Sequence, residues 1–340
     1  MPITKKDSHK VSGYRPVLIA IAGDFFVTVI KFIGFLLSGS GVLFSETVHS
    51  LADTLNQIFL MIGIKRSVQK QNKKFSYGYG KERFFWALIS ACGIFFIGAV
   101  ASIYKGVLSL IHEEQILVSP IIFAILFISL IVEFSTLYVA FKDLKKHNKG
   151  VTLLESLKYG DPATITVVYE DAIAVLGVVI AFGSILLYEL TGNFYWDAIG
   201  SIVIGIMLGI VAVILISKNH GFLVEKSIPK DFRKKIVKLL EAEPSVEKVI
   251  DFKSSVLDIN KYRIKCEIEL NGSALMRKWA KKGLLKEEYE NIKDDYEEFL
   301  KFCVDYMDRA PRLIGTEIDQ LEQMIRENFP EVAHIDIEIN

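Results

Sequence analysis

Ionisable side chains stand inside apolar segments of this sequence, and those of the second segment share one helical face. Glu46, His49 and Asp53 are spaced three and four residues apart, and Asn56 and Gln57 continue the pattern. His49 and Asp53, one turn apart, can direct an imidazole nitrogen and a carboxylate oxygen at one ion, a geometry that divalent metals accept. A hydrogen-bonded packing histidine is the alternative, and Asp53 one turn away makes it the less favoured one.

A second group of acids occupies the fifth apolar segment. Asp161 precedes Pro162, which is typical of a helix N-cap followed by proline at the first helical position, so Asp161 is given a structural role. Glu170 and Asp171 lie two turns deeper and point about 100° apart. We favour Asp171 as a metal ligand. Glu170 either binds the same ion or accepts a hydrogen bond from a neighbouring helix.

Two further acids stand in apolar segments, where an ionisable group is a functional candidate by default. Asp24 lies seven residues before Lys31 on the same helical face, so an ion pair or a hydrogen-bond network between them is the structural alternative. Glu133 has no partner within its own segment. It either lines a cation pathway or stays protonated and neutral.

The elements that position these residues are predicted from runs of about 20 mostly apolar residues, the length that crosses a bilayer. Six runs are found, at 16–38, 42–64, 84–111, 118–141, 163–188 and 196–217. The first is too long and too charged for a signal peptide. The sequence therefore predicts an α-helical polytopic membrane protein with six transmembrane helices in residues 1–217.

Lysine and arginine alternate between the connecting segments. They are abundant before the first run and in the second and fourth loops, and absent at 38–41, 112–119 and 189–197. Because cytoplasmic loops carry the positive excess, both termini are expected in the cytoplasm. The short N-terminus has neither the length nor the arginine content of a transit peptide, which favours a prokaryotic inner membrane.

Residues 218–340 have the shorter apolar runs of a water-soluble domain. The pattern predicts a helix at 230–243, strands at 246–257 and 262–270, a helix at 318–329 and a strand at 333–339, which is an α+β sandwich. A charge-rich helical insertion is expected around 272–315. We interpret it as a solvated helix or hairpin, with an acidic patch that attracts cations as the minority alternative.

Composition excludes several classes of protein. The chain is 51% hydrophobic with a formal net charge of zero, so a nucleic-acid partner is not expected. The three cysteines, Cys92, Cys266 and Cys303, are too far apart in sequence for a thiolate zinc finger, and they read as buried small residues.

Several motifs together resemble the cation diffusion facilitator family of divalent-metal transporters. HSLADTLNQ at 49–57 resembles the family's metal motif in its second span, and YGYGKERFFWALIS at 77–90 resembles the branch that includes the mitochondrial zinc transporter of animals. EDAIAVLGVVIA, WDAIGSIVIG and FPEVAHIDIEI resemble the fifth span, the sixth span and the edge of the C-terminal domain.

The resemblance implies a homodimer of six-helix protomers with a ferredoxin-like cytoplasmic domain, which carries a divalent metal out of the cytoplasm in exchange for protons and is not an enzyme. It places ligands at His49, Asp53 and Asp171. Aligned on Gly177, the usual fourth ligand falls on Val167, so the site is incomplete unless Glu170 or Asp24 substitutes.

In the cytoplasmic domain, a position that binds metal in some members falls on Ile250. His334 and Asp336 alternate on one strand face and could keep part of such a site, although we favour the alternative that they are ordinary polar residues at the sheet edge.

A neutral histidine and three carboxylates carry a charge of minus three, which a low-dielectric site cannot sustain, so protons must occupy the empty site and leave when metal enters. Zn²⁺ is the first expectation, by family prevalence, and Mn²⁺, Fe²⁺ and Co²⁺ suit the same ligands. A membrane protease is not supported, because HSLAD places no general base beside the histidine. A metal sensor or assembly protein without transport is the remaining alternative, and Val167 is the feature that favours it.

Overall fold

The structure is a computed structural model that describes residues 14–147, 162–280, 286, 289–290 and 292–340. The chain divides into two compact units, one of residues 1–66 and 82–220 and the other of residues 67–81 and 221–340. Asp161 and most of the basic fourth loop lie outside the described residues. The loop at 67–81, which joins two helices of the first unit, belongs by its contacts to the second.

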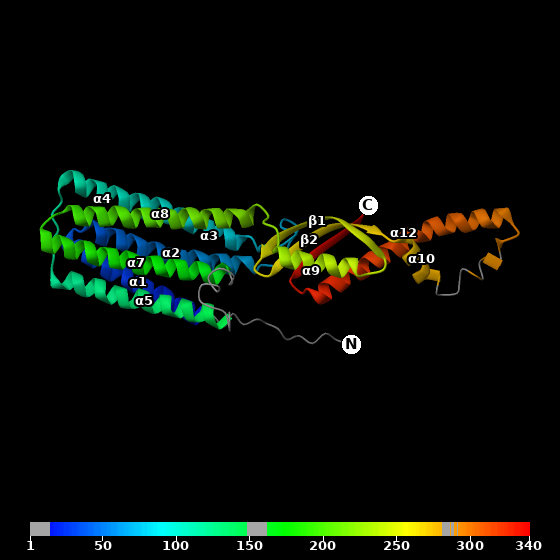
Figure 1. The fold of residues 1–340 in the computed structure, drawn as a ribbon, viewed down its shortest axis with the longest axis horizontal. Coiled ribbons are helices and arrows are strands. Elements are labelled where there is room, and N and C mark those ends of the chain that lie inside the picture. The colour runs from blue at the N-terminus through cyan, green and yellow to red at the C-terminus, as the bar shows by residue number, and fades with distance from the viewer. Residues whose placement is uncertain (1–13, 148–161, 281–285, 287–288, 291) are drawn as a thin grey trace. The chain divides into compact units, whose positions relative to one another are not determined.

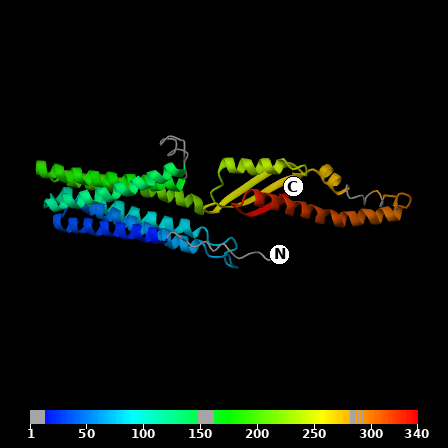
Figure 2. The same ribbon diagram turned by 90° about the horizontal axis from the view of Figure 1, so that it is seen from below.

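The first unit is a bundle of long helices that lie side by side in both ribbon views (Figures 1 and 2). The helices are α1 (Tyr14–Ser38), α2 (Gly41–Ser67), α3 (Glu82–Gly93), η1 (Ile94–Val100), α4 (Ala101–His112), α5 (Pro120–His147), α7 (Pro162–Thr191) and α8 (Tyr195–Leu223). The short π-helical segment η1 joins α3 to α4, so the three form one apolar helical stretch from Glu82 to His112.

Five helical stretches of the described chain are long and apolar enough to cross a membrane: α1, α3–η1–α4, α5, α7 and α8. The helix α2 has 27 residues, which is sufficient length, but it is not among the five. Glu46, His49 and Asp53 interrupt its apolar sequence, and Lys65 and Arg66 lie in its last turn. Five of the six predicted spans are therefore confirmed, and the span with the predicted metal ligands stays a prediction.

Glycines allow α4 and α8 to pack closely. A Cβ atom on Gly106 would lie 2.8 Å from the carbonyl oxygen of Ala198, and one on Gly205 would lie 3.0 Å from the backbone nitrogen of Ile103. Neither helix backbone could stay in place against a larger side chain, so the two form a tightly packed pair.

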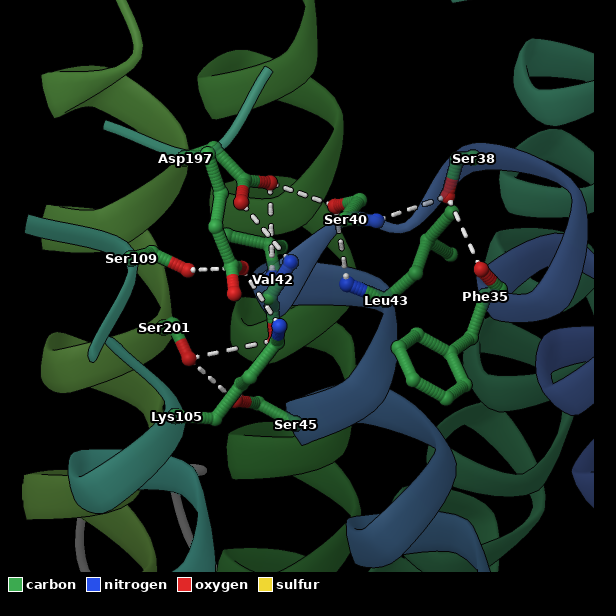
Figure 3. A network of polar contacts seen from close by, with 12 residues as sticks. Phe35, Ser38, Ser40, Val42, Leu43, Ser45, Lys105, Ser109, Asp197 and Ser201 are labelled. Carbon is green, nitrogen blue, oxygen red and sulfur yellow. Dashed lines mark hydrogen bonds and ion pairs between the residues drawn. The ribbon is translucent and has the colours of Figure 1, made fainter. Parts of the chain in front are cut away.

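A buried carboxylate fixes the start of α2, as Figure 3 shows. Asp197, in the first turn of α8, is 2% exposed and accepts a hydrogen bond from the Ser40 hydroxyl. It also accepts from the backbone N–H groups of Gly41 (2.7 Å) and Val42 (3.4 Å), two of the first-turn donors that have no partner inside a helix. The Leu117 N–H donates to the carbonyl of Ser38 nearby (2.9 Å). The turns α1–α2, α4–α5 and α7–α8 therefore meet at one end of the bundle.

The second unit contains a three-stranded mixed sheet with helices, as predicted. Its elements are α9 (Lys230–Glu241), β1 (Val246–Asp258), β2 (Lys261–Leu270), α10 (Gly272–Ala280), α12 (Tyr296–Asn328) and β3 (Val332–Ile339). The strand β2 pairs antiparallel with β1 and parallel with β3. Alternate residues of β2, Ile264, Cys266 and Ile268, are buried in one core with Ile236 of α9 and Ile325 of α12. The two helices therefore cover the sheet with their apolar faces.

The helix predicted at 318–329 is the end of a much longer one. The helix α12 runs for 33 residues from Tyr296, and the Asp295 side chain caps it by accepting hydrogen bonds from the Glu297 and Glu298 N–H groups. The sequence predicts an insertion around 272–315, but its charged turns from Tyr296 onward continue as one helix into the apolar turns at Leu321 and Ile325.

Cys266 is expected to resist alkylation at pH 8 while the sheet is folded. Burial, with smaller contributions from Glu322 and Asp336, raises the pKa of its thiol from 9.0 to about 12, so almost no thiolate is present. Cys303 of α12 is only partly buried and serves as the internal reference. Mass spectrometry after iodoacetamide treatment should find Cys303 modified and Cys266 unmodified; equal rates would contradict this burial.

Because only the unfolded Cys266 thiol ionises between about pH 9 and pH 12, the second unit should also lose stability as the pH rises over that range.

Candidate metal centre

Four helices of the first unit surround a cavity of about 620 Å³. It is lined by residues of α1, α2, α5 and α7, in the part of the bundle away from the end where Asp197 caps α2. Its acidic residues come from all four helices and are Asp24, Asp53, Glu133, Glu170 and Asp171. These are five of the acids that the sequence singled out, brought to one cavity from positions far apart along the chain.

On α2, His49 and Asp53 face each other across one helical turn. His49 Nε2 lies 3.5 Å from Asp53 Oδ2, and neither ring nitrogen has a hydrogen-bond partner among the described residues. His49 is 6% exposed and is not among the residues that line the cavity, whereas Asp53 is. A buried polar atom without a partner costs roughly 1–3 kcal/mol. The pair is thus a donor set that a divalent cation would satisfy.

On α7, Glu170 and Asp171 both line the cavity, as Asp53 of α2 does. Adjacent on one helix, the two side chains reach the same space although their directions differ. The side chain of Val167, where the expected fourth ligand falls, lies outside the described residues. Within the described chain, no three His, Cys, Asp or Glu side chains already stand close enough to hold one ion. The candidate carboxylate ligands Asp53, Glu170 and Asp171 line one cavity but do not form a coordination sphere.

Asp24 and Lys31 have different partners from those proposed for them. Asp24 accepts a hydrogen bond from Gln57 of α2. Lys31 forms ion pairs with Glu46 and Glu133 instead. The seven-residue spacing placed Asp24 and Lys31 on one face of α1, but it could not tell which neighbouring helices that face meets. Asn56, the remaining polar candidate on α2, lines the cavity.

In the second unit, His334 of β3 packs against an aromatic ring. Its imidazole meets Tyr77 edge to face, with 5.2 Å between ring centroids, and the Arg263 guanidinium lies 4.3 Å from the centre of the same tyrosine. Burial, then Arg263 and Arg326, lower the pKa of His334. Asp336 stands opposite Lys265 in the sheet register. These contacts favour a packing role on the sheet surface for His334 and Asp336. Metal binding by the two residues stays a prediction.

Sequence reasoning missed the role of Asp197. WDAIGS was recognised as similar to a family motif, but its aspartate was not assigned a partner. The available indication was a single acid at the start of an apolar segment, facing a turn without lysine or arginine.

Comparison with known proteins identifies the family of the chain. Residues 17–224 match the cation efflux transmembrane domain. The mitochondrial proton-coupled zinc antiporter SLC30A9 of Mus musculus is 34% identical over 99% of this chain and 61% of its own length, and that of Homo sapiens is 35% identical over 96% and 58%. Metal tolerance protein C4 of Arabidopsis thaliana is 34% identical over 98% of this chain and 74% of its own length.

The chain thus spans about three fifths of the length of the animal relatives. The matched domain and the apolar helices together make it a multi-pass membrane protein. The chain belongs to the cation efflux, or cation diffusion facilitator, family, whose members are transporters and not enzymes.

Proposed function

We propose that this chain is a zinc/proton antiporter that moves Zn²⁺ out of the cytoplasm. The observation that carries the proposal is the cavity between α1, α2, α5 and α7, which gathers Asp53, Glu170 and Asp171. The names of the animal relatives, proton-coupled zinc antiporters, support both the metal and the coupling ion. Mn²⁺, Fe²⁺ and Co²⁺ suit the same mixed nitrogen and oxygen ligands and are the alternative substrates.

In this proposal Asp53, Asp171 and His49 bind the ion, and Glu170 completes the set in place of the missing ligand at Val167. Three carboxylates beside a neutral histidine cannot all stay charged in a low-dielectric cavity, so protons hold part of the empty site. An entering cation releases them, and this competition couples metal movement to proton movement. Because the carboxylate ligands line the cavity without a formed coordination sphere, α2 and α7 must approach each other as the ion binds.

The architecture proposed around this site has α2 as a further transmembrane helix, which brings the number of spans to six, both termini in the cytoplasm, a ferredoxin-like C-terminal domain and a homodimeric assembly. The four helices that line the cavity would rock against the pair formed by α3–η1–α4 and α8, as transporters with a site near the bilayer midplane do. The cavity lies towards the helix ends whose connecting loops carry the lysines, which corresponds to a state open to the cytoplasm.

His49→Ala is expected to abolish zinc-dependent proton flux in proteoliposomes without loss of folded protein. The substitution removes the only imidazole beside Asp53 in the described part of α2 and leaves oxygen ligands alone. A pH-sensitive dye trapped in the vesicles reports the flux, and size-exclusion chromatography reports the fold. Wild-type flux in this variant would remove His49 from the site. Bound zinc without turnover in the wild type would favour the sensor alternative.

A further inference from the structure

Lys31 is a buried cation that the proposed exchange does not use. It lies on α1, is 0% exposed, and its ammonium contacts three oxygen atoms from two other helices. Glu46 Oε2 is at 2.9 Å, Ser50 Oγ at 2.8 Å and Glu133 Oε1 at 3.3 Å. Two carboxylates and a hydroxyl around one positive charge are the ligands that a hard metal cation takes in proteins.

One carboxylate oxygen beside Lys31 has no partner in the ammonium group. Glu46 is fully buried, and its second oxygen, Oε1, has no hydrogen-bond partner among the described residues. Gly177 of α7 leaves the space for it, because a Cβ atom there would lie 2.4 Å from Oε1. An unpartnered carboxylate oxygen that is completely buried is costly, and a second positive charge would satisfy it.

Glu133 connects this group to the cavity. Its side chain is 14% exposed, pairs with Lys31 and also lines the cavity together with Asp53 and Asp171. The ammonium therefore lies next to the space in which the transported ion is proposed to bind. Two carboxylates against one ammonium leave the group with a net negative charge when all three are ionised.

We propose that the Lys31 ammonium occupies a second cation position of the membrane unit, formed by Glu46, Ser50 and Glu133, and thereby limits the cavity to one divalent ion. This inference rests on the proposed function, because it takes the cavity as the site of the transported metal. Without the ammonium, Glu46 and Glu133 keep their charges only if another cation takes its place. The oxygen ligands suit a divalent ion such as Mn²⁺ or Zn²⁺.

The test is the number of metal ions bound by purified protein in detergent, measured by equilibrium dialysis with Zn²⁺ and with Mn²⁺. Wild type and Lys31→Arg, which keep the charge, are expected to bind about one ion per chain, and Lys31→Met about two. Lys31→Gln also removes the charge but retains hydrogen-bond donors for the carboxylates, so it gives the same prediction if Lys31→Met does not fold. Lys31→Met/Glu46→Gln, which removes one ligand of the vacated position, should return to about one ion.

Equal binding by wild type and both neutral variants would overturn the second position and leave the proposed transport intact. About two ions on the wild type would also overturn it, because the ammonium would then exclude nothing. No metal on the wild type at all would contradict the cavity as a metal site, which is a failure of the proposed function and is distinguishable from the other results.

Discussion

Replacing Asp53 with asparagine is expected to reduce metal transport by a factor of about 100 or more, since changing even the outer partners of a metal ligand costs 10- to 100-fold. Asp53 is the one residue of α2 that both faces His49 at 3.5 Å and lines the cavity shared with Glu170 and Asp171. The amide keeps the size of the side chain and removes its charge. The loss should therefore come from metal binding and not from packing.

The measurement is uptake of ⁶⁵Zn²⁺ into proteoliposomes, with Glu189→Gln as the matched control. Glu189 is an exposed acid near the end of α7, outside the residues that line the cavity. Its amide variant should transport like the wild type. Asp53→Asn with at least half of the wild-type rate would contradict the role of this carboxylate.

Asp197→Ala is expected to destabilise the membrane unit by roughly 2–4 kcal/mol, because a buried donor left without its acceptor costs about 1–3 kcal/mol and a lost helix cap about 0.5–2 kcal/mol. The Ser40 hydroxyl and the N–H groups of Gly41 and Val42 would lose their acceptor together. Since α2 also carries His49 and Asp53, transport should fall as well.

Thermal unfolding in detergent measures this effect, and Ser109→Ala is the control. Ser109 belongs to the same polar cluster in Figure 3 but donates to Glu114 and not to the start of α2, so its variant should melt close to the wild type. An unchanged melting temperature for Asp197→Ala would show that the cap contributes little. Asp197→Asn keeps an acceptor oxygen, so its melting temperature should lie between those of Asp197→Ala and the wild type.

The sequence was sufficient for features that depend on local periodicity. The run at 16–38 corresponds to α1 at Tyr14–Ser38, and the run at 196–217 lies within α8 at Tyr195–Leu223. The alternation of Ile264, Cys266 and Ile268 identified the buried face of β2. Apolar spacing is a property of each element alone, so it could be read without knowing the neighbours.

Partners between helices could not be read in this way. The spacing of α1 placed Asp24 and Lys31 on one face, but Gln57, Glu46 and Glu133 are their partners because α2 and α5 happen to meet that face. The cap on α2 joins residues 157 positions apart. The length of α12 could not be predicted either. Its first turns are charged and its last turns are apolar, and a charged, solvent-exposed segment has no apolar face to show that it continues the same helix.

The most direct test of the central claim is ⁶⁵Zn²⁺ uptake by wild-type proteoliposomes at two opposed proton gradients, with unlabelled Mn²⁺, Fe²⁺ and Co²⁺ as competitors. We predict zinc accumulation that follows the gradient, stops when a protonophore collapses it, and disappears in Asp53→Asn. Zinc uptake that ignores the gradient, or no zinc uptake by a folded protein, would contradict the account.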